Sequence, residues 1–549
     1  MGTTAERNSP NEDNKMNMNV NKLKIALCRT NVGRKSYSSE ALKSKRNPNL
    51  EKLYTGEKQD FNKVPFKKEK IEDIIKEVKF EYYYFSEGKK NKYKDIPLNV
   101  AIIKEADLPP YRPVDENLHF SVLENDLKII STNKNSGVCS IGLYIKCGSR
   151  YEEISDKVNE QGMSVMIENM AFHSTAHLSH LRTIKSLEKI GANVSCNAFR
   201  EHIVYTCECL KEYLPVVINL LIGNVLFPRF LSWEMKNNMN RLNIMRTKLF
   251  ENNEMYITEL LHNTAWYNNT LGNKLYVCES NIENYTSTNL RNFMLKHFSP
   301  KNMALIGVNV NHDELTKWAS RAFQDYVPIP YTNIKEVNPK YTGGFISVED
   351  KNVKKTNIAI AYETKGGWKT SDMITLTVLQ TLMGGGGSFS TGGPGKGMYS
   401  RLFLNVLNNY NFIESCMAFS TQHSDTGLFG LYFTGEPTNT LDIINAMALE
   451  FHKMNKVTDE ELNRAKKSLK SFMWMSLEYK SILMEDLARQ IMILNRILSG
   501  KQLCDAIDAI TKEDINRVVG HFLKTKPTVV VYGNINHSPH YDEICKILG

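Results

Sequence analysis

The chain has 549 residues, of which 42% are hydrophobic and 23% are charged. This balance is typical of a globular protein with several domains and excludes a largely disordered chain. No uncharged apolar run reaches the roughly 20 residues that a membrane-spanning helix needs, and the run at 213–227 predicts a buried helix. Residues 1–112 hold 24 Lys and Arg against 16 Asp and Glu, so most of the net charge of +9 lies there. The remainder is nearly neutral, and we expect no nucleic-acid partner.

The N-terminal segment has the composition of a targeting sequence. Residues 16–46 contain eight Lys or Arg and a single acid, Glu40. A basic, Ser-containing and acid-poor segment predicts a mitochondrial transit peptide over residues 1–46, and a disordered basic tail is the alternative. Residues 1–15 carry three acids and are expected to be extraneous to it. Residues 47–112 are predicted to form a charged N-terminal extension.

The ten cysteines indicate a reducing compartment. They are scattered, without a C-x-x-C pair or zinc-ribbon spacing. Cys207 and Cys209 would lie on one face of a strand, and we expect both to be buried as small apolar side chains.

A long internal repeat determines the predicted fold. Residues 286–298 predict a capped helix followed by a strand, and residues 511–522 begin the same series at an offset of 224–225. Strictly alternating apolar residues predict strands at 139–147 and 358–362. The sequence therefore predicts an α+β fold of two homologous α/β lobes of about 210 residues, each a mostly antiparallel sheet with helices packed on it.

The spacing of the two copies is not constant. A long polar helix follows Ser232 in the first copy, and another follows the capping box at Thr458 in the second, 226 residues later. The two alternating strands, in contrast, are only about 217 residues apart. We therefore expect an insertion in the second copy, at a glycine-rich segment, and a cleft between similar lobes as a ligand site. The predicted boundaries are a first lobe at 113–330, a linker at 331–345 and a second lobe at 346–549.

A helix of the first lobe contains a recognisable but incomplete metal motif. Val165, Glu168 and Asn169 occupy the positions of the frame H-x-x-E-H. This segment resembles the inverzincin metallopeptidases of the pitrilysin type, in which two His bind zinc and the Glu is the general base. Val cannot bind zinc, Asn binds it poorly, and no carboxylate stands at residues 240–250, where the family has its third ligand. We expect no metal and no catalytic residue in this chain.

Three histidines nearby are a second metal candidate. His173, His177 and His180 fall within eight residues, interleaved with Ser and Thr and without an acidic neighbour. They predict a polar loop or helix end, with adventitious metal binding as the alternative.

The most unusual segment is rich in glycine. Eight of the fourteen residues from Gly384 to Gly397 are Gly. A phosphate-binding loop is excluded because Ser390 and Gly397 stand where G-x-x-x-x-G-K-[ST] requires Gly and Ser or Thr. A flexible linker fits poorly because the segment lies inside a lobe. We expect a mobile loop whose bare backbone closely approaches an extended peptide.

The glycine-rich segment and the following residues 398–402 resemble a branch of the same family, the α subunits of mitochondrial processing peptidases. Residues 162–175 and 460–493 resemble that branch as well, and the match covers about 115–549. The resemblance implies a heterodimer in which a partner β subunit carries the zinc. The α-type chain would itself be inactive, with no cofactor of its own.

The resemblance also implies the role of the segment. It would bind the basic presequences of imported precursors in the mitochondrial matrix, or at the matrix face of the inner membrane. The implied substrate-binding residues are Gly384, Gly385, Gly386, Gly387, Ser388, Phe389, Ser390, Gly392, Gly393, Pro394, Gly395, Lys396 and Gly397. An alternative partner set is the mitochondrial cytochrome bc complex, in which homologous chains are structural core subunits. An independent peptide-binding module is a third reading.

Overall fold

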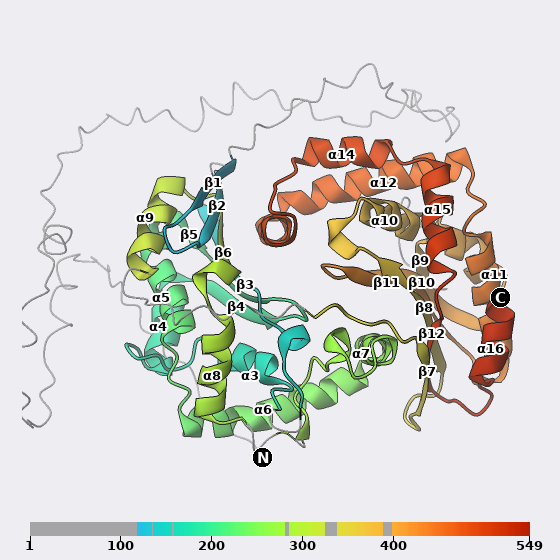
Figure 1. Ribbon diagram of the computed structural model, residues 1–549, viewed down its shortest axis with the longest axis horizontal. Helices are drawn as coiled ribbons and strands as arrows, with labels where there is room; N and C mark the ends of the chain where they lie inside the picture. Colours follow the sequence, from blue (N-terminus) through green and yellow to red (C-terminus); the bar gives the residue numbers. More distant parts are fainter. Residues whose placement is uncertain are drawn as a thin grey trace, which may run out of the picture. The chain divides into compact units, whose positions relative to one another are not determined.

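The computed structural model describes residues 118–549, apart from 134–135, 156–158, 280, 282–284, 324–336 and 388–397. Every described residue belongs to one compact unit within residues 110–549 (Figure 1). The predicted transit peptide and charged extension lie outside the described residues. Within the described part, no helix combines the length and apolarity needed to cross a membrane.

The first sheet has six strands in the order β1-β2-β6-β3-β5-β4. β2 and β6 are parallel, and all other neighbours are antiparallel. The strands are β1 (Leu118–Val122), β2 (Lys128–Thr132), β3 (Val138–Ile145), β4 (Asn193–Ala198), β5 (Ile203–Leu210) and β6 (Met303–Val308).

The second sheet has the order β7-β12-β8-β11-β10-β9. β7 and β12 are parallel, and the other neighbours are antiparallel. The strands are β7 (Gly344–Glu349), β8 (Thr356–Lys365), β9 (Gly385–Gly387), β10 (Ile413–Gln422), β11 (Thr426–Gly435) and β12 (Thr528–Gly533). β7 begins inside the predicted linker.

Five strands of each sheet match in order and direction, with β2, β6, β3, β5 and β4 equivalent to β7, β12, β8, β11 and β10. This confirms the predicted α+β fold with two homologous lobes. Strand starts are offset by 216 residues for β2 and β7, 218 for β3 and β8, 220 for β4 and β10, and 225 for β6 and β12. The expectation of a single insertion at the glycine-rich segment is therefore wrong. The extra residues are distributed among several connections, and only two fall between β8 and β10.

Each lobe adds seven α-helices to its sheet within the described residues. The first lobe, from β1 to α9, contains α3 (Met163–Asn169), α4 (His180–Ile190), α5 (Leu214–Leu226), α6 (Ser232–Glu251), α7 (Asn253–Ala265), α8 (Ser287–His297) and α9 (His312–Phe323). The second lobe, from β7 to α16, contains α10 (Asp372–Met383), α11 (Thr440–Lys453), α12 (Asp459–Glu478), α13 (Lys480–Arg489), α14 (Gly500–Asp508), α15 (Lys512–Phe522) and α16 (Tyr541–Leu548).

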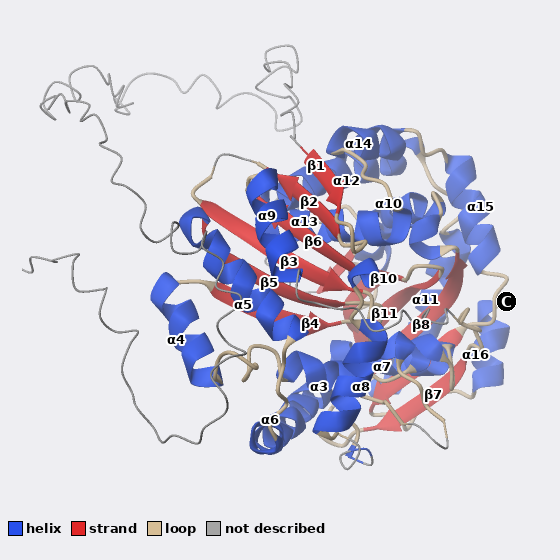
Figure 2. Ribbon diagram, turned by 60° about the vertical axis from the view of Figure 1, so that its left-hand side comes forward, coloured by secondary structure: helices blue, strands red, loops and turns tan. Residues whose placement is uncertain are grey.

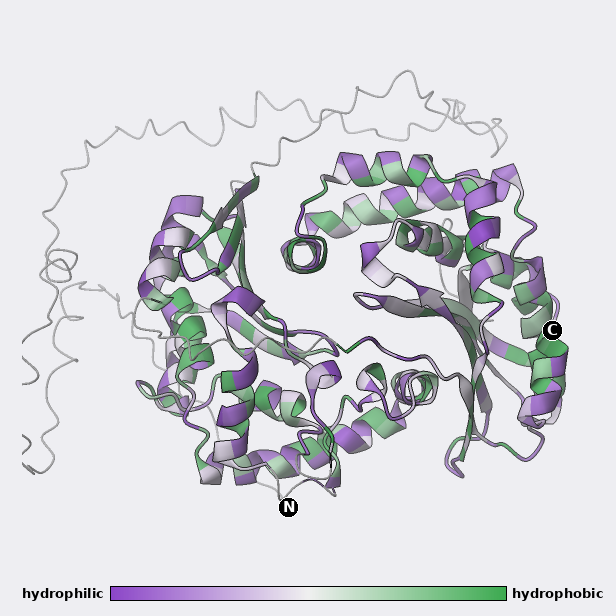
Figure 3. Cartoon of the chain, in the orientation of Figure 1, coloured by the Kyte–Doolittle hydropathy of each residue, from purple (hydrophilic) through white to green (hydrophobic). Residues whose placement is uncertain are grey.

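Local sequence signals account for several of these helices. The side chains of Thr286, Thr458 and Thr511 cap α8, α12 and α15, as the repeat predicts, and the last two form capping boxes. α5 is the apolar run at 213–227 and is largely green in Figure 3. It packs on the first sheet, which satisfies its continuous apolar surface.

One face of each sheet is covered by its own lobe. α3, α5, α8 and α9 pack on the first sheet, and α10, α11, α15 and α16 pack on the second. Cys207 and Cys209 lie in the first of these cores, as expected. Figure 2 shows α5 and α9 in front of the first sheet.

The other face of each sheet is covered by a helix from the opposite lobe. α13 of the second lobe packs on the first sheet, where Leu483, Met484 and Leu487 meet Ile306 and Val204. α7 of the first lobe packs on the second sheet. α13 contacts β6 and β3 of that sheet. This reciprocal exchange buries the second face of each sheet and packs the two lobes together.

Candidate functional site

The helix that carries the incomplete metal motif is held by a buried carboxylate. α3 begins after Gly162, which has a left-handed φ of 82°. Because glycine has no side chain, Gly162 cannot cap the first N–H groups of the helix. The Glu152 carboxylate replaces that cap, accepting hydrogen bonds from the N–H groups of Gly162 and Ser164 at 2.8 and 2.9 Å and from the Ser164 hydroxyl at 2.5 Å. Burial raises the pKa of Glu152 to about 7 despite these hydrogen bonds.

The two histidine positions of the motif hold no zinc ligands. Val165 is buried, and the side-chain amide of Asn169 donates to the Val165 carbonyl at 2.9 Å, one turn back on the same helix. Burial raises the pKa of Glu168 to about 7, although the Ala198 N–H donates to its carboxylate. The Glu168 carboxyl thus lies beside two positions that offer no ligand to a metal ion. These residues do not fit a zinc ion.

The helix that supplies the third ligand in the family contributes an amide instead. Asn238 on α6 donates to the Asn169 carbonyl at 3.4 Å, to Met170 Sδ at 3.0 Å and to His173 Nε2 at 3.0 Å. The site is therefore filled by side-chain and backbone hydrogen bonds. Among the described residues, no group of three or more His, Cys, Asp or Glu is placed to hold a metal ion.

The histidine cluster next to α3 is held by the backbone. His173 and His180 stack with ring centroids 4.3 Å apart, and each Nδ1 donates to a carbonyl, of Ala171 and Phe172, at 3.1 Å. His177 packs edge-on against Phe227. The residues form the entry to α4, which is the polar loop or helix end predicted from the sequence.

The glycine-rich segment begins as regular structure. Gly384 ends α10 with φ 59°, and Gly385–Gly387 form β9, paired with Ser415–Met417 of β10. The prediction of a mobile loop is wrong for these four glycines. A Cβ on Gly385 would lie 2.3 Å from the Cys416 carbonyl oxygen, so the close pairing requires glycine. Residues 388–397, which include Ser388, Phe389, Pro394 and Lys396, lie outside the described residues.

Both ends of this segment meet at one point. A Cβ on Gly384 would lie 2.4 Å from the Cβ of Ser400, so the two arms touch there. The next residue, Arg401, is buried and donates to both Glu461 carboxylate oxygens at 2.9 and 2.8 Å and to the carbonyls of Lys453 and Lys456. The hydrogen bond from Arg401 lowers the pKa of Glu461 to about 2. These hydrogen bonds attach Arg401, four residues after the end of the glycine-rich segment, to the turn between α11 and α12.

A cavity of about 1300 Å³ lies beside Gly387, where the glycine-rich segment leaves the second sheet. Gly387 lines it together with the corner between α6 and α7 and one end of the second sheet. Its acidic lining residues are Glu251, Glu254, Asp350 and Glu414, and its basic ones are Lys248, Lys354 and Lys355. An ion pair neutralises Lys355 and Glu414.

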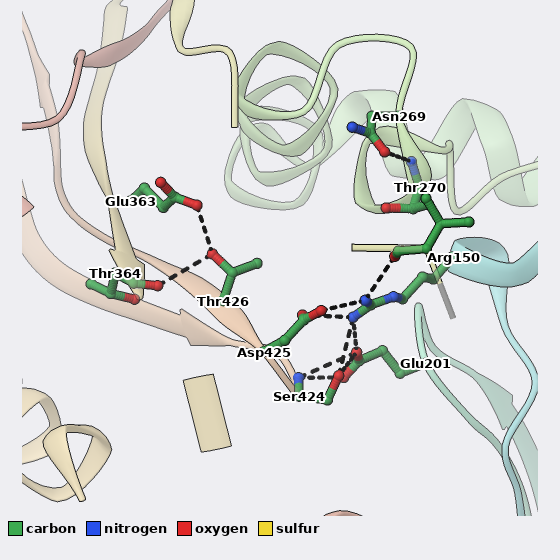
Figure 4. Close-up of polar contacts among 10 residues, drawn as sticks. Arg150, Glu201, Asn269, Thr270, Glu363, Thr364, Ser424, Asp425 and Thr426 are labelled. Carbon is green, nitrogen blue, oxygen red and sulfur yellow. Dashed lines mark hydrogen bonds and ion pairs between the residues drawn. The ribbon is translucent and has the colours of Figure 1, made fainter. Parts of the chain in front are cut away.

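The two lobes are joined by a buried arginine. Arg150, between β3 and α3, donates to both carboxylate oxygens of Asp425 at 2.8 and 2.6 Å, to Glu201 at 2.5 Å and to Ser424 at 3.1 Å (Figure 4). Burial alone would lower the pKa of Arg150, but the hydrogen bond to Asp425 and the Glu201 charge outweigh it and raise the pKa. Asp425 follows β10 in the second lobe, so this network bridges the lobes.

A second cavity, of about 540 Å³, lies between the lobes. It is lined from the first lobe by Arg200 and Glu259, an ion pair at 2.7 Å, and from the second lobe by Trp368 and Arg489, whose guanidinium lies 4.1 Å from the indole. The cleft predicted between the lobes is thus present as a partly open cavity with charged and aromatic walls.

Sequence reasoning did not find this interlobe network. Arg150 stands in the segment Cys147–Glu152, which carries no catalytic or metal-binding pattern. In the structure, a Cβ on the neighbouring Gly148 would lie 2.3 Å from the Phe199 carbonyl oxygen, so this segment is tightly packed. Such close packing is not visible in a single sequence.

Two family descriptions match the chain in succession. "Insulinase (Peptidase family M16)" matches residues 128–279, and "Peptidase M16 inactive domain" matches residues 284–469. The mitochondrial-processing peptidase subunit alpha of Solanum tuberosum is 36% identical over 455 residues, which is 82% of this chain and 88% of that protein. The chain belongs to the M16 peptidase family. Its resemblance to the α-type branch is confirmed.

Other relatives of this M16 chain carry the same description. The mitochondrial-processing peptidase subunit alpha of Homo sapiens is 31% identical over 487 residues, covering 84% of this chain and 91% of that protein. A probable subunit alpha-2 of Arabidopsis thaliana, described as chloroplastic/mitochondrial, is 35% identical over 431 residues, covering 78% and 85%. The M16 chain is thus a homologue of these α subunits over most of its length.

Proposed function

We propose that this chain is the non-catalytic α subunit of a mitochondrial processing peptidase. It pairs with a zinc-bearing β subunit in the matrix and binds basic presequences through the glycine-rich segment, Gly384 to Gly397. The partner supplies the zinc and cleaves the peptide. The proposal rests on how the segment is built. It is anchored at both ends, and the three residues of β9 are glycines, which have no side chains.

The anchoring fits a substrate-handling role. A Cβ on Gly384 would touch Ser400, and Arg401 binds Glu461, so the described residues on the two sides of 388–397 are anchored close together on the second lobe. β9 is the last strand of its sheet, so its outer edge has no described strand beside it. Free backbone N–H and C=O groups on such an edge can pair with an extended peptide.

The incomplete motif supports a division of labour between subunits. Val165 and Asn169 hold no metal, so Glu168 has no zinc-bound water to deprotonate. The carboxylates Glu251 and Glu254 line the cavity beside Gly387. Once the Lys355–Glu414 pair is set aside, this cavity carries three carboxylates and two lysines, and this small excess of negative charge favours a basic peptide.

The test replaces residues 388–397 with a short Gly-Ser turn in the full chain and measures presequence cleavage with a zinc-bearing β-type partner. We expect the KM for the peptide to rise at least tenfold, with subunit association and thermal unfolding unchanged. An unchanged KM would contradict the proposal.

A second assay tests the division of labour. The wild-type chain alone should cleave nothing, and cleavage should require the partner. Cleavage by the isolated chain would mean that the reading of α3 is wrong.

A further inference from the structure

The second cavity, which both lobes line, has no part in the proposed function. We call it the interlobe cavity. Its volume of about 540 Å³ lies within the range of about 300–1000 Å³ that is usual for sites of small organic molecules. Tyr151, Phe199 and Trp368 contribute aromatic rings to its wall. The interlobe cavity therefore has the size and the partly apolar lining of a small-molecule site.

The wall of the interlobe cavity carries a small excess of positive charge. Its four cationic side chains are Lys146, Arg200, Lys369 and Arg489, and its three carboxylates are Glu201, Glu259 and Glu485. Two of these carboxylates already accept hydrogen bonds from the protein. Arg150 and Ser424 donate to Glu201, as Figure 4 shows, and Arg200 donates to Glu259. The wall thus favours a ligand with a single negative charge over a basic peptide.

Arg489 places a firmly oriented guanidinium in this wall. The guanidinium lies 4.1 Å from the centre of the Trp368 ring, and the indole N–H donates to the Gln422 carbonyl at 2.9 Å. Within the described part of the chain, Arg489 donates only to Asp486, through Nη2 at 2.7 Å. A guanidinium has five N–H donors, so most of them remain available to a ligand. Planar donors of this kind match the two oxygens of a carboxylate.

A buried tyrosine of the first lobe offers a further donor. Tyr144 is 3% exposed and lines the cavity, yet its hydroxyl has no hydrogen-bond partner among the residues that the structure describes. Buried polar atoms are nearly always hydrogen-bonded, so this hydroxyl marks the position of a ligand acceptor. Burial raises the pKa of Tyr144, and the hydroxyl therefore keeps the proton that it donates.

A buried histidine of the second lobe offers an acceptor. The Nδ1–H of His262 donates to the Thr258 carbonyl at 2.7 Å, so Nε2 of His262 accepts from Nε2–H of His423 at 3.2 Å. This leaves a lone pair on Nδ1 of His423, which is 6% exposed, lines the cavity and has no described donor at that nitrogen. Burial lowers the pKa of His423 to about 4, so the ring is neutral at pH 7 and accepts from an O–H or N–H group.

We propose that the interlobe cavity binds a small organic carboxylate that has a flat aromatic body and a hydroxyl or N–H donor. The carboxylate pairs with Arg489 and accepts from the Tyr144 hydroxyl. The flat body lies against the aromatic wall, and the donor binds Nδ1 of His423. A carboxylate fits better than a phosphate because it is planar and carries one charge. The inference does not depend on the proposed function, since the first cavity has the opposite excess of charge.

The experiment measures binding by titration calorimetry with the complete complex of this chain and a zinc-bearing β-type partner. The probes are 3-hydroxybenzoate, 4-hydroxybenzoate and 6-hydroxy-2-naphthoate, which differ in the separation of the carboxylate from the hydroxyl. The carboxamide of each probe keeps its shape without the charge. We expect at least one carboxylate to bind once per complex, and its carboxamide to bind at least about tenfold more weakly.

Two variants assign that binding to the interlobe cavity. Arg489→Met should weaken it at least about tenfold, and Tyr144→Phe about fivefold. Tyr144→Phe preserves the buried ring and so remains informative if Arg489→Met fails to fold. The matched control is Arg464→Met, because Arg464 also lies over an aromatic ring, that of Tyr399 at 5.7 Å, but does not line the cavity. Its affinity should equal that of the wild type.

Three results would overturn the inference. The first is that none of the three carboxylates binds with a Kd below about 1 mM. The second is equal affinity for a carboxylate and its carboxamide, which would mean that the wall does not recognise the charge. The third is an unchanged Kd in the folded Tyr144→Phe variant, which would place the binding elsewhere in the complex.

Discussion

Arg150 of the first lobe makes two parallel hydrogen bonds to Asp425 of the second lobe, at 2.8 and 2.6 Å. The Arg150 side chain is 4% exposed and that of Asp425 is 22% exposed, so water screens the pair only partly. Planar, bidentate pairing fixes the relative angle of the two groups as well as their distance. Arg150 thus helps to fix how the two lobes, which both line the second cavity, are placed relative to each other.

Arg150→Gln should destabilise the protein strongly, because it leaves Asp425 and Glu201 without their buried cation. Removing one partner of a buried pair typically costs about 3–5 kcal/mol. Urea unfolding followed by circular dichroism measures the change. The matched control is Lys355→Gln, since Lys355 and Glu414 are 51% and 47% exposed and such pairs contribute about 1 kcal/mol or less. Equal losses for both variants would contradict a buried interlobe anchor.

Neighbouring glycines of β9 should differ sharply in their tolerance of alanine. Gly385 has φ 139° and no room for a Cβ beside Cys416, whereas a Cβ on Gly386 would have no neighbouring atom within 4 Å. Gly385→Ala should therefore cost about 1–3 kcal/mol in stability, and Gly386→Ala well under about 1 kcal/mol. Thermal unfolding of the two variants compares them, and a Gly386→Ala loss as large as that of Gly385→Ala would refute the described edge strand.

His297 should make the stability depend on pH. Its imidazole is 1% exposed and neither ring nitrogen has a described hydrogen-bond partner; burial lowers its pKa to about 3. The unfolded state then binds the proton more readily than the folded state. Stability contributed by the neutral ring is complete above about pH 6.5 and is lost as the pH falls towards 3, by about 1.4 kcal/mol per pH unit.

The His297→Leu variant should remove this loss, so that its advantage over the wild type in urea unfolding grows between pH 7 and pH 5. The matched control is the histidine at the corresponding position of the second copy of the repeat. His521 occupies the equivalent position in the second lobe and is exposed, so its ring stays in water in both states. His521→Leu should leave the pH profile of the wild type unchanged, and an identical profile for His297→Leu would show that His297 is solvated.

Metal removal should leave this chain unaffected. Val165 and Asn169 provide no ligand set, so EDTA should not shift its unfolding midpoint, and elemental analysis of the purified chain should find far less than one zinc per chain. The zinc-bearing partner, treated identically, is the positive control and should lose activity. A stoichiometric zinc in the isolated chain would contradict the description of α3.

The sequence alone determined the repeat, the caps and the chemical deficit of α3. The capping boxes at Thr458 and Thr511 are local, and Val165 lacks a donor atom in any fold. Alternating apolar residues also identified β3 and β8. These properties depend on residue types at short spacing, and so a single chain is sufficient to reveal them.

Only the tertiary structure decided what the buried faces meet. Periodicity shows that α7 and α13 have apolar sides, but hydrophobic burial is non-directional, so it does not specify that each covers the sheet of the other lobe. The Arg150–Asp425 pair could not be predicted from the sequence either, because its two residues are 275 positions apart. The sequence also hid β9, since its three glycines have no side-chain pattern and pair through their backbone with a strand that follows later in the chain.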